Sequence, residues 1–150
     1  FEAAKAHRRV AEVQQWLGRQ DKATASFRRA HTLLSGLSPE YADAADVRYE
    51  RLQLLALAPS TVLGGGSVEA QLAEAVALGA GITDPPRRWT VGAVEVKLGW
   101  AREKAGDSAG AAAAYQAAID HLAPGPDRGG RPPNVVFEQS LARQRLAALY

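Results

Sequence analysis

Histidine, acidic and glycine residues are the side chains of this sequence that could support catalysis, metal binding or phosphate binding. The three histidines, His7, His31 and His121, are far apart in the chain, and their spacing matches no metal-binding motif such as HExxH. Asp43 and Asp46 lie close together, but the glycine and the further ligands of a calcium loop are missing around them. Cysteine is absent, which excludes a disulfide framework and a thiolate nucleophile. The sequence therefore predicts a chain that is not an enzyme and holds no cofactor or metal.

A run of three glycines, Gly64 to Gly66, precedes Ser67 and a predicted helix, where backbone amides could face an anion. No lysine follows the run and no strand precedes it, as a phosphate-binding loop would require. We therefore interpret the run as a connection between helices, with Ser67 as the cap of a helix from Val68 to Leu78.

Charge is distributed unevenly along the chain. The 150 residues include 18 basic and 16 acidic side chains, a net charge of +2, which is too small to indicate nucleic-acid binding. The first 31 residues hold seven basic and three acidic side chains, a local charge of +4. This segment is either an ordinary solvated helix face or a patch that attracts an acidic peptide or surface.

Neither a membrane-spanning run of about 18 apolar residues nor a signal-peptide pattern is present, so we expect no direct membrane insertion. A chain without cysteine fits either side of a membrane. The compartment is therefore left open between the cytoplasm, which is favoured, and the exocytoplasmic part of a membrane-anchored parent. Because the chain starts with Phe1 in what already reads as a helix, we expect it to be a piece of a larger protein.

Apolar residues recur at steps of three and four along most of the chain, which predicts helices. A long helix is expected to reach from Tyr41 to about Leu57, with Ser38 as its cap. Two further predictions concern which side chains are buried. The helix from Glu2 to Leu17 is expected to bury Ala3, Ala6, Val10, Val13 and Leu17, and the helix from Val135 to Tyr150 is expected to use Val136, Leu141, Leu146 and Leu149 as anchors.

Two segments share one spacing, in which a glycine is followed by alanine five residues on, an aromatic residue nine on and alanine twelve on. They are Gly18, Ala23, Phe27, Ala30 and Gly106, Ala111, Tyr115, Ala118, and Val68, Leu72 and Ala75 form a degenerate middle copy. A tight turn followed by such a helix is half of a helical hairpin. The pattern predicts an all-α chain of three antiparallel hairpins, at about 1–36, 38–79 and 85–122, followed by an irregular loop over 123–134 and a capping helix over 135–150.

The runs from Ala6 to Leu34 and from Val94 to Leu122 resemble tetratricopeptide repeats, including those of large bacterial signalling proteins such as serine/threonine kinases. Ala11 and Gly99 match the small residue of the first helix of the repeat. The resemblance implies one domain over residues 1–150, in which the hairpins stack as a right-handed superhelix. The three units are offset by 45 and 43 residues, whereas the family repeats every 34, so its curvature is not carried over.

The resemblance also implies a protein-interaction scaffold that binds a peptide or a partner helix on the concave face, which the first helix of each hairpin lines. Glu12 stands where the family's carboxylate clamp has an asparagine, and Ala93 stands where it has a lysine, so capture of a peptide's terminal carboxylate is not expected. The residues singled out for binding a protein or an acidic peptide are Lys5, Arg8, Glu12, Trp16, Lys97 and Trp100.

Two alternatives stay open. Trp16 and Trp100 could cover the joints between repeats instead of anchoring a partner. The whole chain could also serve as a self-association or spacer segment of a multidomain signalling protein, with Leu141 and Leu149 at the contact. Mobility is the favoured interpretation of the loop that carries Arg128 and Arg131, with partner contact second.

Overall fold

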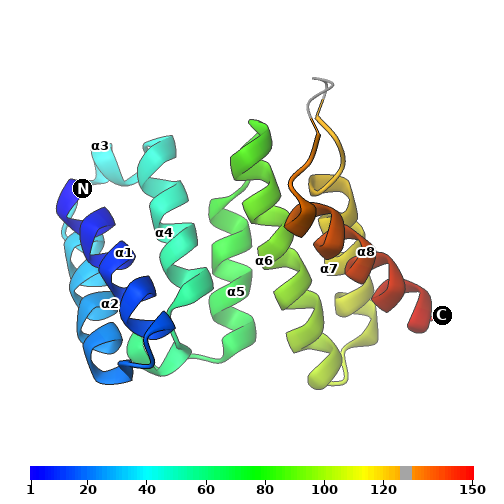
Figure 1. Ribbon diagram of the computed structural model, residues 1–150, viewed down its shortest axis with the longest axis horizontal. Helices are drawn as coiled ribbons and strands as arrows, with labels where there is room; N and C mark the ends of the chain where they lie inside the picture. The colour runs from blue at the N-terminus through cyan, green and yellow to red at the C-terminus, as the bar shows by residue number, and fades with distance from the viewer. Residues whose placement is uncertain (126–129) are drawn as a thin grey trace. The chain divides into compact units, whose positions relative to one another are not determined.

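The structure, a computed structural model, describes residues 1–125 and 130–150 (Figure 1). Within this part of the chain there are eight α-helices, packed largely as sequential antiparallel pairs, and no strand, so the all-α prediction is confirmed. The contacts gather in two compact units, Phe1–Leu78 and Gly79–Tyr150, which are described separately below as unit 1 and unit 2. The assembly of the hairpins into one superhelical stack stays a prediction.

Unit 1 contains two helical hairpins. In the first, α1 packs along α2, and in the second, α4 packs along α5, while a short helix and a single 3-10 turn form the connections (Figure 1). The bounds are α1 (Glu2–Trp16), α2 (Gln20–Ser35), α3 (Pro39–Ala42), α4 (Ala45–Leu57), η1 (Ser60–Val62) and α5 (Val68–Leu78).

Unit 2 consists of the hairpin α6 (Pro85–Lys104) and α7 (Ser108–His121) with α8 (Pro133–Ala148) packed mainly on α7. Helix α6 begins at Pro85, the predicted start of its hairpin, and α8 begins two residues before its predicted start at 135. In both, a proline fits the first helical turn, where its missing N–H is not needed. The predicted mobility of the loop at Arg128 concerns residues 126–129, which lie outside the described residues.

The two glycine turns adopt the backbone that the repeat spacing requires. Gly18 has φ 71° and Gly106 has φ 81°, the left-handed region in which a side chain is strained. The cap predicted at Ser67 is confirmed, since its hydroxyl oxygen accepts the N–H of Ala70 at 3.0 Å. Ser38 occupies the N-cap position as predicted, but of the short helix α3, and its side chain makes no capping hydrogen bond.

Each of the two clear repeats buries its aromatic residue against small residues of the paired helix. Phe27 and Tyr115 are fully buried, together with the alanines of the same spacing. A Cβ atom added at Gly99 would lie 2.6 Å from Cε1 of Tyr115, closer than atoms can approach. The small position of α6 is therefore the space that the Tyr115 ring occupies.

The predicted apolar stripe of α1 is exposed, so this prediction is wrong. The helix instead buries Ala4, Arg8 and Ala11, which share another face, while Val10, Val13 and Leu17 point to solvent. Small residues fit under the Phe27 ring, and larger ones would hold the two helices apart. The three-and-four spacing occurs on both faces, so periodicity alone could not choose between them.

Three further predictions differ from the structure. The long helix from Tyr41 is interrupted, because Ala44 has an extended ψ of 138° and α4 starts anew at Ala45. Because the helix restarts there, Val47 is buried in the core and Tyr41 is exposed to solvent. Val68, the first member of the degenerate middle copy, and Val136, a predicted anchor of the last helix, are also exposed.

We expect Gly99→Ala to lower the free energy of unfolding even though alanine is the better helix former. Overpacking against the fully buried Tyr115 ring, three atoms of which lie within 2.9 Å of the added Cβ, should cost about 2–3 kcal/mol, more than the ~1 kcal/mol gained in helix propensity. Urea unfolding followed by circular dichroism measures the difference. Gly66→Ala, which meets no atom within 4 Å, is the matched control. A Gly99→Ala protein as stable as the wild type would contradict the close packing.

Candidate interaction surfaces

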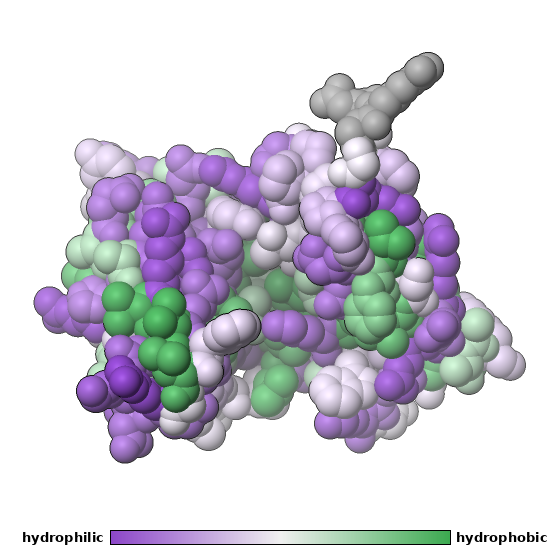
Figure 2. Space-filling view, in the orientation of Figure 1, coloured by the Kyte–Doolittle hydropathy of each residue, from purple (hydrophilic) through white to green (hydrophobic). Residues whose placement is uncertain are grey.

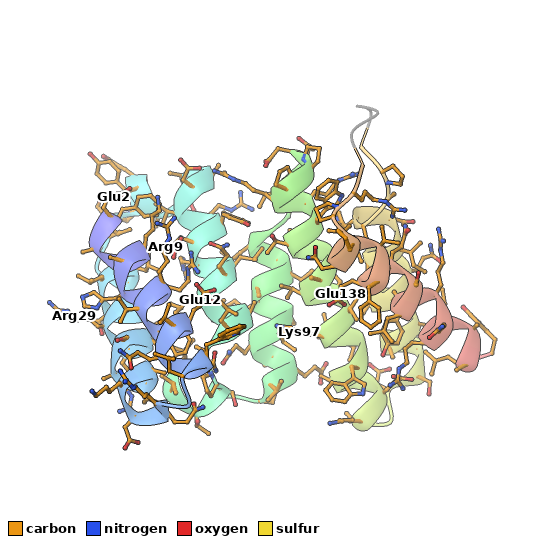
Figure 3. All side chains as sticks on the ribbon, viewed as in Figure 1. Glu2, Arg9, Glu12, Arg29, Lys97 and Glu138 are labelled. Carbon is orange, nitrogen blue, oxygen red and sulfur yellow. The ribbon has the colours of Figure 1, made fainter. Side chains whose placement is uncertain are left out.

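The six residues predicted to bind a partner divide between the two units. Lys5, Arg8, Glu12 and Trp16 belong to α1 in unit 1, whereas Lys97 and Trp100 belong to α6 in unit 2. Figure 3 labels one residue of each group, Glu12 and Lys97. Each group is described within its own unit, and a common face that joins the two groups stays a prediction.

Arg8 is engaged inside unit 1. Its side chain is only 5% exposed; Nε donates to the carboxylate of Glu50 on α4, and Nη1 donates to Oε2 of Glu12 at 2.9 Å. Glu50 is also buried. The guanidinium that was expected to line a groove therefore joins α1 to α4. It also pairs with the carboxylate of Glu12. A charge buried in this way requires its partner, because an unpaired ion in the interior is costly.

Lys5 lies at the N-terminal end of the same helix. It is half-buried; its Nζ is 5.2 Å from the centroid of the Phe1 ring and 3.5 Å from a carboxylate oxygen of Glu2. The ammonium group of Lys5 is therefore held by the Phe1 ring and the Glu2 carboxylate, so Lys5 contributes little to a cationic surface that a partner could contact.

Trp16 is the most prominent of the predicted residues, with 94% of its surface exposed. It lies in a cluster of exposed apolar side chains on α1, which we call the α1 patch: Val10, Val13, Trp16 and Leu17. Figure 2 shows hydrophobic surface gathered over the C-terminal half of this helix. Beside it is a hollow of about 390 Å³, which Leu57 and Glu12 also line. Apart from Trp16, the prediction missed this cluster because it assigned Val10, Val13 and Leu17 to the core.

Exposed basic residues flank the α1 patch. Arg9 precedes Trp16 by seven residues on the same helix, and so shares its face, while Arg19 and Lys22 follow across the turn at Gly18. Figure 3 shows Arg9 and Glu12 projecting from α1. The acidic residues nearby in sequence are Glu12, which pairs with Arg8, and Asp21.

Trp100 lines a groove in unit 2, which we call the α6–α8 groove. The groove measures about 280 Å³ and is lined by Val96, Lys97, Trp100, Tyr115, Glu138, Leu141 and Arg145. Trp100 is 49% exposed, and Nζ of Lys104 stands 3.8 Å from the centroid of its ring. This distance is that of a cation–π contact, which holds the indole in place.

Polar contacts fix the floor of the α6–α8 groove. The hydroxyl of Tyr115 donates to Oε2 of Glu103 at 2.6 Å, and Nη1 of Arg145 is 3.8 Å from the same oxygen. Burial raises the pKa of Glu138, and the charge of Lys97 acts in the opposite direction. Figure 3 shows Lys97 and Glu138 on α6 and α8. The lining of the groove thus combines apolar side chains with charged side chains of both signs.

Glu95 and His121 form a second buried contact, between α6 and α7. Glu95 is 3% exposed, and its Oε2 lies 2.7 Å from Nδ1 of His121. Burial raises the pKa of Glu95, and Asp120 acts in the same direction, whereas His121 lowers it. The remaining histidines, His7 and His31, lie on α1 and α2 in unit 1.

Among residues 1–125 and 130–150, no group of three or more histidine, aspartate or glutamate side chains is placed to hold a metal ion. A helix with the length and apolarity needed to cross a membrane is also missing from these residues. The glycine run leads into the cap at Ser67, in agreement with its interpretation as a connection.

Comparison of the chain with protein-family models, with curated proteins and with solved structures found no match. The surfaces described above are therefore the basis for a function.

We expect the loss of one partner of the Arg8–Glu50 pair to destabilise the protein strongly. Glu50→Gln leaves the guanidinium buried beside a neutral amide and should cost about 3–5 kcal/mol in the free energy of unfolding. The double variant Arg8→Met, Glu50→Leu should recover most of this loss, because no charge then stays buried. Glu12→Gln, at a partly exposed partner, should cost only about 1 kcal/mol or less. Urea unfolding of the four proteins measures these differences; a Glu50→Gln loss no larger than that of Glu12→Gln would contradict the assigned role.

The raised pKa of Glu95 predicts a pH dependence of stability. The unfolded chain releases this proton near the ordinary value of 4.5, while the folded protein keeps it to higher pH. Because the folded state then binds more protons, the free energy of unfolding should fall as the pH rises above 4.5, until the raised pKa is passed. Glu95→Gln should make this decline smaller and leave the part that the raised pKa of Glu138 contributes, whereas Glu40→Gln, at an exposed site, should keep it in full. Urea unfolding at a series of pH values tests both variants, and an unchanged decline in Glu95→Gln would refute the assignment.

Proposed function

We propose that this chain is a protein-interaction module without enzymatic activity, and that the α1 patch is its main contact surface. The observation that carries the proposal is the exposure of an apolar helix face that ends in Trp16. Monomeric proteins seldom leave contiguous apolar side chains in water, and such patches mark interaction sites. Tryptophan is enriched among the residues that dominate binding energy, because it buries a large area with few rotatable bonds.

The scaffold beneath this surface is, in our proposal, a divergent array of tetratricopeptide-like hairpins. In support, two hairpins share the glycine turn and a buried aromatic residue, which packs on Gly99 in one and is buried in a cluster with Ala4 and Ala11 in the other. Such arrays are built for binding, since each hairpin leaves one side open to a partner. The right-handed stacking of three hairpins and a cap is part of the same proposal.

The partner is a protein segment that combines apolar and acidic side chains. Arg9, Arg19 and Lys22 are exposed around the patch, so their charges attract carboxylates, while Val13 and Trp16 require apolar contacts. Arg8 has no part in this contact because Glu50 and Glu12 hold its guanidinium. Trp100 and Lys97 offer a separate contact in unit 2, beside the α6–α8 groove.

Selection of random displayed peptides on the wild-type chain tests the proposal. We expect the recovered peptides to be rich in acidic and aromatic residues and to lose at least about tenfold in affinity on Trp16→Ala, the effect of a strong interface anchor. Fluorescence anisotropy with labelled peptides gives the affinities. Since Trp16 is exposed, its removal should leave the circular dichroism spectrum unchanged.

Trp100→Ala is the matched control, because it removes another exposed tryptophan from unit 2. Peptides that bind wild type and Trp16→Ala equally would place the contact elsewhere. Loss of binding on Trp100→Ala alone would favour the α6–α8 groove over the α1 patch.

A further inference from the structure

The two hairpins of unit 1 carry opposite net charges. Residues 1–36 include seven basic and three acidic side chains, whereas residues 37–78 include two basic and six acidic ones. The first segment thus has a charge of +4 and the second a charge of −4. Unit 1 as a whole is neutral but strongly dipolar, so one side of it is complementary to the other side of a second copy.

The acidic side contains an apolar hollow, which we call the α3 hollow. It measures about 410 Å³ and is lined by Phe1, Leu37, Tyr41, Ala44, Asp46 and Val47. Tyr41 is 65% exposed on its wall, and Glu40 and Asp43 are exposed on the same turn of chain. The basic group in this area is Lys5, which contacts the Phe1 ring and pairs with Glu2. The hollow is therefore lined mainly by apolar side chains, with Asp46 in its lining and Glu40 and Asp43 exposed on the adjacent chain; we call these three carboxylates its acidic rim.

The α1 patch and the α3 hollow lie at opposite ends of one helix. Phe1 immediately precedes α1, and Trp16 is its last residue, so about 22 Å of helix separates them at 1.5 Å per residue. Both features belong to unit 1, whose internal packing joins α1 to α2 and α4. The patch therefore cannot fill the hollow of its own chain.

We propose that the α1 patch of one copy docks into the α3 hollow of a second copy, which joins the chains head to tail. The inference rests on the proposed function, and it names the partner. Trp16 supplies the apolar contact. The basic residues around the patch face the acidic rim of the hollow: Arg9, Arg19 and Lys22 on one side, and Glu40, Asp43 and Asp46 on the other. No patch contacts another patch, and no hollow contacts another hollow. The proposed contact is heterologous: one patch enters one hollow without a reciprocal contact, so each added copy exposes a fresh patch and a fresh hollow.

Sedimentation velocity over a range of protein concentrations tests the arrangement. We expect the average mass of the wild-type chain to rise past that of a dimer with concentration, and to fall when salt screens the charges. A patch variant, Trp16→Ala with Arg19→Glu, and a hollow variant, Tyr41→Ala with Asp43→Lys, should each stay monomeric. All four positions are exposed, so circular dichroism should show both variants folded.

The decisive sample is an equimolar mixture of the two variants. The patch variant keeps an intact hollow and the hollow variant keeps an intact patch, so the mixture should form a dimer and nothing larger. Phe137→Ala, which removes an exposed aromatic side chain of unit 2 and alters neither surface, should assemble as the wild type does.

A wild-type chain that stays monomeric at every concentration would overturn the head-to-tail contact, as would a mixture that remains monomeric. Wild-type association that stops at a dimer would also contradict it, since that result indicates a symmetric interface. Peptide binding that depends on Trp16 in a monomeric chain would preserve the proposed function while refuting this inference.

Discussion

The close contact between the Tyr115 ring and Gly99, which has no side chain, holds the α6–α7 hairpin together. Gly99 provides the space that the Tyr115 ring fills, and the two helices approach until no further atom fits between them. In the first hairpin, Phe27 is buried with Ala4 and Ala11 from the facing helix. Because the side chains of α1 that face α2 must be small, the larger apolar side chains of α1 lie on its exposed face. The same constraint that forms the hairpin thus creates the surface available for binding.

The position of Arg8 on the inner face of α1 also explains why this predicted binding residue is buried. Arg8 shares that face with Ala4 and Ala11, so its guanidinium enters the space between α1 and α4. Glu50 neutralises it there, and Glu12 satisfies a further N–H group. Burial of such a pair specifies which helices meet more than it adds stability. The pair orients the second hairpin against the first, and this orientation leaves Leu57 beside the hollow under Trp16.

Local signals in the sequence were sufficient for the turns and for most helices. Gly18 and Gly106 need a left-handed backbone, and the small and aromatic positions of α2 and α7 are spaced for one buried face, so both features could be predicted. The burial of α1 could not, since its two faces have the same periodicity and only the Phe27 ring across the hairpin decides between them. Glu50 is 42 residues from Arg8, and no local pattern announces a contact over that separation. Trp16 was identified because the tetratricopeptide resemblance assigns it to the groove-facing side of the first helix and tryptophan is an efficient interface anchor, whereas its apolar neighbours were mistaken for core.

Helix α1 turns Arg8 inward and an apolar face outward, and we propose that a partner binds this face. The three indole N–H groups, of Trp16, Trp89 and Trp100, report on it directly in a nitrogen–proton NMR correlation spectrum. On addition of a peptide that the chain has been shown to bind, the Trp16 signal should shift while the Trp89 and Trp100 signals stay in place. A shift at Trp100 or Trp89 with an unchanged Trp16 signal would contradict the account.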